Sequence, residues 1–472
     1  MDLALSLDNN SKEPLYQQIY NQIKNEITEG KLLPGQRLPS ARSFAMFLQV
    51  SRSTVDLAYE QLRAEGYIEA RQRSGFFICE LASYNVHEIY SERLTDEVNE
   101  SDNSVAEKES AAKQQYSYKT DFSPYEIDMS VFPTGTWKKI SREVISREDL
   151  LQKGDAQGDK NLRETLCRYL YNARGVKCLP EQIIVGAGND YLLLLLEKIM
   201  GQRQKVAVEN PSYKRACQIF NSFSYELCYV GMDEKGMLPE VLDTLGATLV
   251  YCMPSHQFPM GVTMTVGRRM ELLKWATRTG GYLIEDDYDS EFRYKGRPIP
   301  SLQSMDTSGR VIYMGTFSKS ISSAWRFSYM VLPMELLEIY KEKVGFYSCT
   351  VSRFDQQILT EFISEGYFER HLNRMRKHYR EKRDYILKLL APFQKCFEIS
   401  GEDSGLHLVL KDKQNREDEE LVLKAKDEGV RVYGLNELMF KKEKTSTVIL
   451  GYGRLSLEEI EDGINKLKEA WL

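Results

Sequence analysis

The segments YLIEDDYDS (residues 282–290) and VIYMGTFSK (residues 311–319) decide how the larger part of this chain folds. Each begins with a short apolar run, and apolar runs bounded by polar residues are typical of buried strands. The first run ends at Glu285-Asp286-Asp287-Tyr288, and the second ends at Thr316-Phe317-Ser318-Lys319. The polar groups of this part of the chain therefore stand where its strands end.

Further strand and helix patterns alternate on both sides of these segments. The apolar runs that predict strands are residues 183–185, 205–209, 247–253, 282–286, 311–316 and 328–332. Amphipathic patterns predict helices over residues 189–200, 213–220 and 268–277. This alternation indicates an α/β layer architecture with a largely parallel sheet. Beyond about residue 334 a helical region leads to a smaller α+β part, and we interpret its basic run 374–383 as a solvated helix face.

The N-terminal part has a different pattern. Apolar residues at helical spacing predict a first helix over residues 14–29 that ends at Gly30. Ser40 is a good N-cap for a short helix through Leu48, and Ser51 caps a third helix. The buried face of the third helix is expected to consist of Val55, Ala58, Tyr59 and Leu62.

Two short strands, residues 67–71 and 76–78, follow the third helix and are joined by a turn that contains Ser74-Gly75. A helix, a helix-turn-helix and a two-stranded wing form the geometry that places one helix in the major groove of DNA. The same pattern also fits a protein-interaction domain whose arginines are simply solvated.

Charge is sorted unevenly along this N-terminal part. The formal net charge of the whole chain is -6, which by itself does not indicate a nucleic-acid partner. Between Lys31 and Val55, however, there is no acidic residue, and the basic residues are Lys31, Arg37, Arg42 and Arg52. Arg71 and Arg73 add positive charge to the predicted wing. This sorting creates a surface that suits the phosphates of double-stranded DNA.

Residues 81–118 form a third kind of segment. The stretch ERLTDEVNESDNSVAEKESAAKQQ is acidic, rich in Ser and Asn, and poor in apolar residues. A segment of this composition cannot bury enough apolar surface to become ordered. We expect a flexible acidic linker between two modules.

Length and composition set further bounds. At 472 residues the chain is expected to contain two or three domains, and its 42% hydrophobic and 28% charged residues are typical of a soluble globular protein. The eight cysteines are scattered without metal-ligand spacing, so we predict neither disulfides nor a metal site. No signal peptide or membrane-spanning segment is expected, and a cytoplasmic protein is predicted.

The N-terminal part resembles the winged-helix domain of GntR-type bacterial regulators. The resemblance covers nearly the whole part and is carried by Leu38-Pro39-Ser40-Ala41-Arg42, Val50-Ser51-Arg52-Ser53-Thr54-Val55, Ala58-Tyr59, Glu65-Gly66-Tyr67-Ile68 and Arg73-Ser74-Gly75. It implies DNA contacts from Ser40, Arg42, Ser51, Arg52, Thr54, Arg73 and Ser74.

From about residue 120 to residue 472 the chain resembles the fold-type I aminotransferases, which use pyridoxal 5′-phosphate (PLP). The resemblance is carried by Asp286, Tyr288 and Lys319 at strand ends, with Arg326 seven residues beyond the lysine. A lysine amine forms a Schiff base with the PLP aldehyde, and a carboxylate keeps the pyridine nitrogen protonated. Arginine, hydroxyl groups and a helix N-terminus bind the phosphate dianion.

The resemblance implies a role for each matching residue. Lys319 is the Schiff-base lysine, Asp286 the partner of the pyridine nitrogen, and Tyr288 the donor to the ring oxygen O3′. The phosphate is assigned to Gly188, Asn189, Ser318 and Arg326. Tyr213 matches the aromatic residue that stacks on the ring, and the loop with His256 and Gln257 is expected to approach O3′. We interpret the remaining histidines, His407 among them, as structural or surface residues.

The complete chain is similar to the MocR/GabR-type transcriptional regulators. Its expected organisation is a winged-helix DNA-binding domain over residues 10–80, the linker 81–118, and a PLP-binding effector domain over 119–472 with a smaller C-terminal α+β part. The resemblance implies a homodimer that senses PLP, or its adduct with an amine or amino acid effector, and controls binding to a promoter operator. It also implies a protein that is not primarily an enzyme, although residual half-transamination remains open.

One position departs from the aminotransferase pattern. Aminotransferases of this fold commonly carry an arginine in a C-terminal strand that binds the substrate carboxylate, and Ile449 stands there in this chain. Arg215, two residues after Tyr213, is our candidate for an effector-binding arginine, with a helix-surface arginine as the alternative. The departure favours a sensor over the alternative function, an active aminotransferase with a secondary DNA-binding module.

Overall fold

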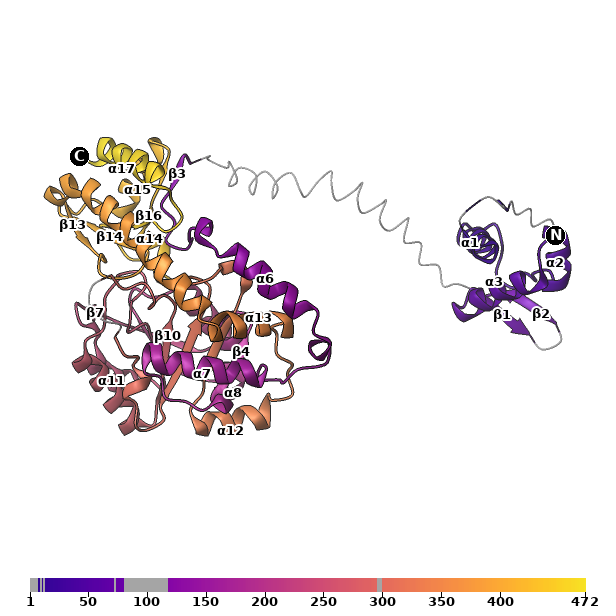
Figure 1. Cartoon of the computed structure of the whole chain (residues 1–472), viewed down its shortest axis with the longest axis horizontal. Coiled ribbons are helices and arrows are strands. Elements are labelled where there is room, and N and C mark those ends of the chain that lie inside the picture. Colours follow the sequence, from indigo (N-terminus) through magenta and orange to yellow (C-terminus); the bar gives the residue numbers. More distant parts are fainter. Residues whose placement is uncertain (1–6, 9–10, 12, 72–73, 80–117, 295–298) are drawn as a thin grey trace. The chain divides into compact units, whose positions relative to one another are not determined.

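The computed structural model describes residues 7–8, 11, 13–71, 74–79, 118–294 and 299–472. The chain divides into two compact units, residues 1–115 and residues 116–472, which are drawn in Figure 1 and described here one at a time. Apart from Tyr118, the expected linker 81–118 lies outside the described residues, and so does Arg73.

The first unit is a winged helix-turn-helix. Its elements are α1 (Leu15–Thr28), α2 (Ala41–Leu48), α3 (Arg52–Ala64), β1 (Ile68–Arg71) and β2 (Gly75–Ile78), and the two strands pair antiparallel. The hydroxyl groups of Ser40 and Ser51 accept hydrogen bonds from the third backbone N–H of α2 and α3, which satisfies groups that a helix start leaves free. The unit has its own apolar core, to which all three helices and both strands contribute. The predicted fold of the N-terminal part is confirmed.

The second unit is built on a seven-stranded sheet in the order β4-β12-β11-β10-β9-β5-β6. The strands are β4 (Ile183–Gly186), β5 (Lys205–Glu209), β6 (Glu226–Val230), β9 (Leu249–Cys252), β10 (Tyr282–Asp287), β11 (Val311–Thr316) and β12 (Ser328–Val331). Strand β12 pairs antiparallel with both of its neighbours, and the other pairs are parallel. The largely parallel sheet was predicted from the sequence, and this prediction is confirmed.

Helices cover both faces of this sheet because its strands are apolar on both sides. In β11, Ile312 and Met314 pack into one core, whereas Val311 and Tyr313 contribute to cores on the other face, as the two-residue period of a strand requires. The first core is covered by α8 (Asn189–Met200), α9 (Lys214–Ser222) and α12 (Met334–Lys343). The opposite face is covered by α6 (Thr134–Ile145), α7 (Lys160–Arg174), α11 (Val266–Thr279), α13 (Arg353–Ser364) and the start of α14 (Tyr367–Leu389).

The C-terminal elements gather in a smaller part of the second unit (Figure 1). A four-stranded antiparallel sheet has the order β13 (Phe397–Ser400), β14 (His407–Asp412), β17 (Thr447–Gly451) and β16 (Tyr433–Gly434). Helices α15 (Asp418–Asp427) and α17 (Leu457–Trp471) share a core with this sheet and with the end of α14. The remaining short elements are β3 (Thr120–Asp121), β7 (Met232–Asp233), β8 (Gly236–Met237), α10 (Leu242–Leu245), β15 (Val430–Arg431) and α16 (Leu435–Leu438).

The interpretation of the basic run 374–383 as a solvated helix face is wrong for one of its basic residues, and Met375 and Tyr379 within the run are also buried. Lys382 lies in α14 with only 2% of its surface exposed, and its ammonium group is 2.6 Å from a carboxylate oxygen of Asp128. His378 contacts the same oxygen at 2.8 Å. A buried lysine needs such a partner, because an unpaired charge is costly to remove from water.

Within the described residues, every helix is too short or too polar to cross a lipid bilayer.

Candidate functional site

A cavity of about 530 Å³ lies at the carboxyl ends of β10 and β11 in the second unit. Ligands of open α/β sheets bind at this edge, because the loops that follow the strands surround it. Eight residues that the sequence analysis assigned to a cofactor or effector line the cavity: Asn189, Tyr213, Arg215, Asp286, Tyr288, Ser318, Lys319 and Arg326.

Asp286 is held in place by two donors. The Tyr251 hydroxyl donates to one carboxylate oxygen at 2.5 Å, and the Asn189 amide donates to the other at 3.2 Å. Burial raises the pKa of Asp286 to about 6, and the hydrogen bond from Tyr251 opposes this shift. A cationic partner inside the cavity would favour the charged form, so the carboxylate suits a protonated ring nitrogen.

Lys319 follows β11 and reaches the same cavity. Its ammonium group donates to the backbone carbonyl of Pro124 at 2.9 Å. Burial lowers the pKa of Lys319 to about 8, because removal from water disfavours the charged form. A larger fraction of this amine is therefore neutral, and hence nucleophilic, near neutral pH than for a surface lysine.

Tyr288 is oriented by a chain of polar groups behind it. Its hydroxyl lies 3.0 Å from Nδ1 of His256, and the same nitrogen is 2.8 Å from a carboxylate oxygen of Asp289. Both His256 and Asp289 are buried, and Nε2 of His256 has no hydrogen-bond partner among the described residues. His256 thus contacts Tyr288 from behind and is not among the residues that line the cavity.

The start of α8 and Arg326 together form an anion cradle. Gly188 precedes the helix with a φ of +94°, and a Cβ atom there would lie 2.3 Å from the Arg326 guanidinium. A residue with a side chain would therefore block the approach of Arg326 to the helix N-terminus. Ser318 lies nearby, with its hydroxyl 2.9 Å from that of Thr316. Backbone N–H groups, a hydroxyl and a guanidinium are the usual ligands of a phosphate.

Two other predicted residues differ in their relation to the cavity. Tyr213 lines it directly before α9 and meets Phe258 edge to face, with the ring centroids 6.0 Å apart. Gln257 lies behind the wall, where its amide group donates to the carbonyl of Pro211 at 2.7 Å and accepts from the N–H of Met260 at 3.0 Å. Its side chain is thus used to hold the loop.

Arg215 and Arg326 share one acidic partner at the cavity rim. The Arg215 guanidinium lies 2.5 Å from one oxygen of Asp190, and the Arg326 guanidinium lies 3.0 Å from the same oxygen. The Arg215 side chain is 57% exposed. Arg215 is thus partly a helix-surface arginine, as the alternative interpretation stated, and it also lines the cavity.

Ile449 is fully buried in β17, opposite Val409 of β14 and Tyr433 of β16. These residues belong to the apolar core that extends beneath the cavity. The position at which the sequence comparison with aminotransferases would place a carboxylate-binding arginine is therefore apolar in this chain.

Several functional candidates were missed by sequence reasoning. Tyr251 contacts Asp286, Asp190 pairs with both rim arginines, and Tyr125 and Phe258 contribute aromatic walls. Asp190 directly follows Asn189, so its proximity to the helix start was a usable signal. His407, interpreted as structural or surface, is buried with its ring 5.2 Å from that of His256, and burial lowers its pKa to about 3.

A buried ion pair supports the cavity from behind. Arg174, at the end of α7, lies 2.7 Å from a carboxylate oxygen of Asp287 and also donates to the hydroxyl of Ser255. Asp287 neighbours Asp286, and Ser255 neighbours His256. Arg174 thereby ties β10 to the loop that orients Tyr288.

The described DNA-contact candidates of the first unit lie at the starts of α2 and α3 and on the wing. Arg42, Arg52 and Ser74 are exposed, and Arg52 pairs with Asp56 one helical turn along at 3.3 Å. The Tyr59 hydroxyl donates to the carbonyl of Pro39 at 3.1 Å and so joins α3 to the start of α2. The helix starts can receive phosphates, and α3 has the position of a recognition helix.

The residues of the cavity fit PLP. Asp286 suits the ring nitrogen, Lys319 the aldehyde, and the cradle of Gly188 and Arg326 the phosphate. The buried amide oxygen of Asn189 has no hydrogen-bond partner among the described residues, which leaves an acceptor inside the site. The fold and site define a DNA-binding regulator that carries an aminotransferase-like domain.

Comparisons with known proteins agree with this class. Residues 15–78 match the gntR family of bacterial regulatory proteins, and residues 125–459 match aminotransferase class I and II. The uncharacterized HTH-type transcriptional regulator YdeL of Bacillus subtilis (strain 168) is 39% identical, with 100% of both chains covered. The probable rhizopine catabolism regulatory protein MocR of Rhizobium meliloti is 32% identical over 99% of this chain and 96% of that protein. This chain therefore belongs to the family of MocR-like HTH-type transcriptional regulators.

The structural comparison supports the second unit in particular. The kynurenine aminotransferase of Pyrococcus horikoshii superposes with a TM-score of 0.69 and 25% sequence identity, covering 82% of this chain and 98% of that one. The predicted aminotransferase-like fold and the predicted transcription regulator are both confirmed.

Proposed function

We propose that this regulator senses PLP, or an adduct of PLP with an amine or amino acid, and changes its affinity for promoter DNA in response. The observation that carries the proposal is one cavity in which a partly buried lysine, a buried carboxylate and an anion cradle meet, in a chain that also holds a winged helix. We place the protein in the cytoplasm as a homodimer, as the family resemblance implies.

Each residue has a defined task in this proposal. When bound, PLP supplies an aldehyde and an electron-withdrawing ring. Lys319 would hold the aldehyde covalently, and Asp286 would keep a proton on the ring nitrogen. Tyr288, oriented by His256, would donate to the ring oxygen, and Tyr213 would contact the ring. Gly188, Asn189, Ser318 and Arg326 would bind the phosphate.

The effector contact is assigned to Arg215. Because Ile449 cannot bind a carboxylate, an amine effector with a carboxylate needs another cation, and Arg215 lies on the same cavity. The effector carboxylate would replace Asp190 as the partner of Arg215. Breaking the Arg215–Asp190 ion pair would cost little, because exposed ion pairs contribute little stability. If no such effector exists, PLP alone is the signal.

The second candidate function is an active PLP-dependent aminotransferase whose DNA module is secondary. It is favoured by the cavity residues, which suffice for binding PLP and for half-transamination of an amine. It is disfavoured by Ile449, because the arginine with which aminotransferases of this fold commonly bind the substrate carboxylate is absent from that position.

The decisive experiment measures DNA affinity and cofactor state together. Wild type and Lys319→Ala are titrated onto DNA that flanks the gene, with and without PLP and with a panel of amines and amino acids. We expect wild type to be yellow, to carry a borohydride-reducible label on the Lys319 peptide, and to change its DNA affinity with PLP, whereas Lys319→Ala does none of these. A reducible covalent label that persists in Lys319→Ala would refute the lysine assignment. Multiple turnovers with an amino donor and keto acceptor, without any effect on DNA, would favour the aminotransferase.

A further inference from the structure

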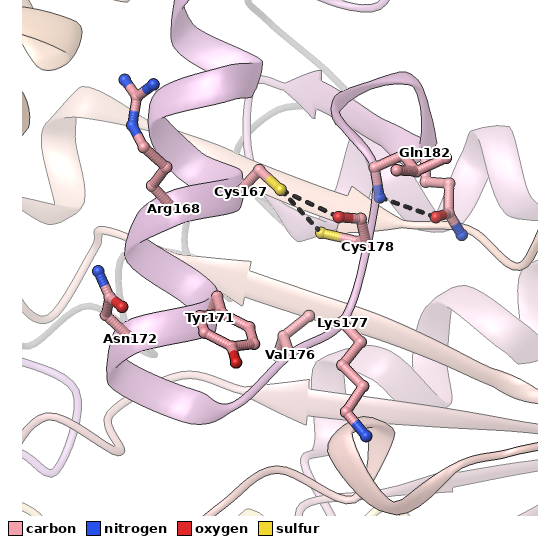
Figure 2. A pocket seen from close by; sticks show the side chains of 9 residues that line it. Cys167, Arg168, Tyr171, Asn172, Val176, Lys177, Cys178 and Gln182 are labelled. Carbon is pink, nitrogen blue, oxygen red and sulfur yellow. Dashed lines mark hydrogen bonds between the residues drawn. The ribbon is translucent and has the colours of Figure 1, made fainter.

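Two thiols face each other in the second unit, away from the cofactor cavity. Cys167 lies in α7, and Cys178 lies between this helix and the short helix η3 (Pro180–Gln182). Their sulfur atoms are 3.9 Å apart, and the Cys167 thiol also donates to the backbone carbonyl of Cys178 at 3.0 Å. Figure 2 shows the two side chains directed toward each other across the gap between helix and loop.

Small molecules can reach both thiols. Each cysteine is half-buried, and both line an open cavity of about 560 Å³ (Figure 2). The side chains of Arg168 and Lys177 line the same cavity. Burial raises the pKa of the Cys178 thiol.

The arrangement suits oxidation better than metal binding. Stable sites for zinc and related metals use three or four protein ligands. Among the described residues, no group of three or more His, Cys, Asp or Glu side chains is arranged to hold a metal ion. A disulfide, by contrast, needs only two sulfurs that can approach to about 2 Å, which here is a short movement of one helix residue and one loop residue.

We propose that Cys167 and Cys178 form a reversible disulfide that transmits oxidation to the cofactor cavity through Arg174. With a peroxide as oxidant, the Cys167 thiolate attacks one peroxide oxygen, forms a sulfenic acid and, after protonation, releases water. The Cys178 sulfur then attacks the sulfenic sulfur, the S–S bond forms, and a second water leaves with the proton. A small dithiol reverses the reaction by exchange and is itself oxidised to a disulfide.

The contacts of the intervening segment explain how oxidation reaches the cofactor cavity. Arg174, which pairs with Asp287 behind the cavity, lies within the ring that a Cys167–Cys178 bond would close. Lys177 is tied to Gln303 by two hydrogen bonds of 2.9 and 2.8 Å, and the N–H of Gln303 donates to Glu285 of β10 at 2.8 Å. A shift of residues 174–178 therefore acts on the strand that carries Asp286.

The effect on the cofactor rests on the proposed PLP function, whereas the disulfide itself does not. The full chain is treated with hydrogen peroxide, blocked with an alkylating reagent and digested without reduction. We expect a linked peptide with Cys167 and Cys178 that has lost two hydrogen atoms and disappears after dithiothreitol treatment. PLP affinity, followed by absorbance, should fall several-fold on oxidation and recover on reduction.

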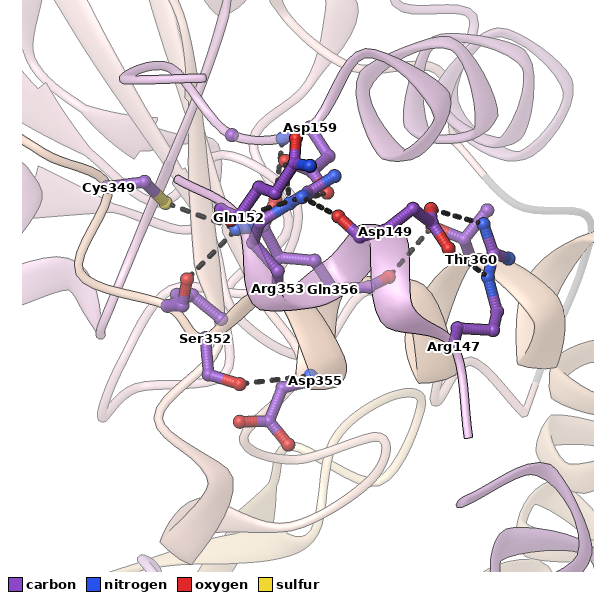
Figure 3. Close-up of polar contacts among 12 residues, drawn as sticks. Arg147, Asp149, Gln152, Asp159, Cys349, Ser352, Arg353, Asp355, Gln356 and Thr360 are labelled. Carbon is purple, nitrogen blue, oxygen red and sulfur yellow. Dashed lines mark hydrogen bonds and ion pairs between the residues drawn. The ribbon is translucent and has the colours of Figure 1, made fainter. Parts of the chain in front are cut away.

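Matched variants separate the possible outcomes. Cys167→Ser and Cys178→Ser should abolish the linked peptide and the change in PLP affinity. The control is Cys349→Ser, because Cys349 is also half-buried but contacts the Gln356 amide at 3.5 Å (Figure 3) and the Val185 carbonyl at 3.5 Å. This control should behave like wild type. If oxidised wild type yields no linked peptide, the proposed disulfide is wrong. If the oxidised protein contains the disulfide and binds PLP with unchanged affinity, the proposed effect of the disulfide on the cofactor cavity is wrong. If the Cys167–Cys178 disulfide forms in wild type that binds no PLP, the proposed PLP function is wrong and the disulfide stands.

Discussion

At the scale of single residues, Asp190 is the group that connects the proposed phosphate and effector sites. One of its oxygens contacts the guanidinium groups of both Arg215 and Arg326. An anion that binds either arginine must therefore compete with this carboxylate. The contact is partly exposed, so we expect the competition to be modest and to weaken with added salt.

The first residue-scale prediction concerns Arg215. Arg215→Ala should weaken the binding of a carboxylate-bearing amine effector by about 2–3 kcal/mol, because a charge-assisted contact is lost. PLP affinity should stay near that of wild type. Titration of the PLP-loaded protein with amino acids, read from the cofactor absorbance, measures both quantities. Equal effector affinity in both proteins would place the carboxylate site elsewhere, and Arg168→Ala, on the separate cavity, serves as control.

A second residue-scale prediction concerns Glu209, a buried carboxyl at the end of β5. Burial raises the pKa of Glu209 to about 8 from an ordinary value of 4.5. The folded state thus holds the proton more tightly than the unfolded state, so the contribution of Glu209 to stability falls as pH rises from about 4.5 to about 8. The fall is at most about 1.4 kcal/mol per pH unit.

Glu209→Gln should remove this dependence. The difference in urea unfolding free energy between wild type and variant, measured at about pH 6 and about pH 8, should favour the variant more at the higher pH. The control is Glu342→Gln at an exposed position, which should leave the pH dependence of the unfolding free energy as in wild type. A pH-independent difference between wild type and Glu209→Gln would contradict the raised pKa.

At the scale of elements, the sequence could predict the strands whose signals are local. In β10 and β11 the apolar run and the polar end occupy one continuous stretch, so the positions of Asp286 and Lys319 at strand ends followed directly. The contact of Tyr251 with Asp286 could not be predicted, because it depends on the parallel pairing of β9 with β10. Burial of Lys382 likewise depends on Asp128, which is 254 residues away in sequence.

The element-scale prediction concerns the starts of α2 and α3. Arg42→Ala and Arg52→Ala should each weaken operator binding, by about 1–3 kcal/mol and with relaxed specificity if a base contact is lost. Loss of a phosphate contact should instead reduce the salt dependence of binding. Fluorescence anisotropy at several salt concentrations distinguishes these cases. Arg63→Ala, in the last turn of α3, is the matched control and should bind like wild type.

At the scale of the whole molecule, the two compact units have separate cores and separate sites. Every residue that lines the proposed cofactor cavity belongs to unit 116–472, and the described DNA-contact candidates belong to unit 1–115. Each unit has an apolar core made from its own helices and strands. We therefore expect cofactor binding to proceed without the winged helix.

The corresponding prediction is that a chain of residues 116–472 binds PLP with an affinity within about twofold of the full chain, a difference of less than about 0.5 kcal/mol. The same truncated chain should not bind operator DNA. Absorbance titration and a DNA-binding assay on both chains test the two parts. Loss of PLP binding in a truncated chain that still unfolds cooperatively would show that the cavity depends on the N-terminal unit.

The reversed direction of β12 has a consequence for how this pocket can evolve. Since β12 runs antiparallel to β11, the chain re-enters the sheet after residues 317–327, at the edge that it has just left. A parallel strand would need a long crossover to the opposite edge. Lys319 and Arg326 therefore lie in the same short connection, and its length sets the spacing between the amine and the guanidinium. A single-residue insertion between Lys319 and Arg326 would therefore change the position of the amine relative to the guanidinium.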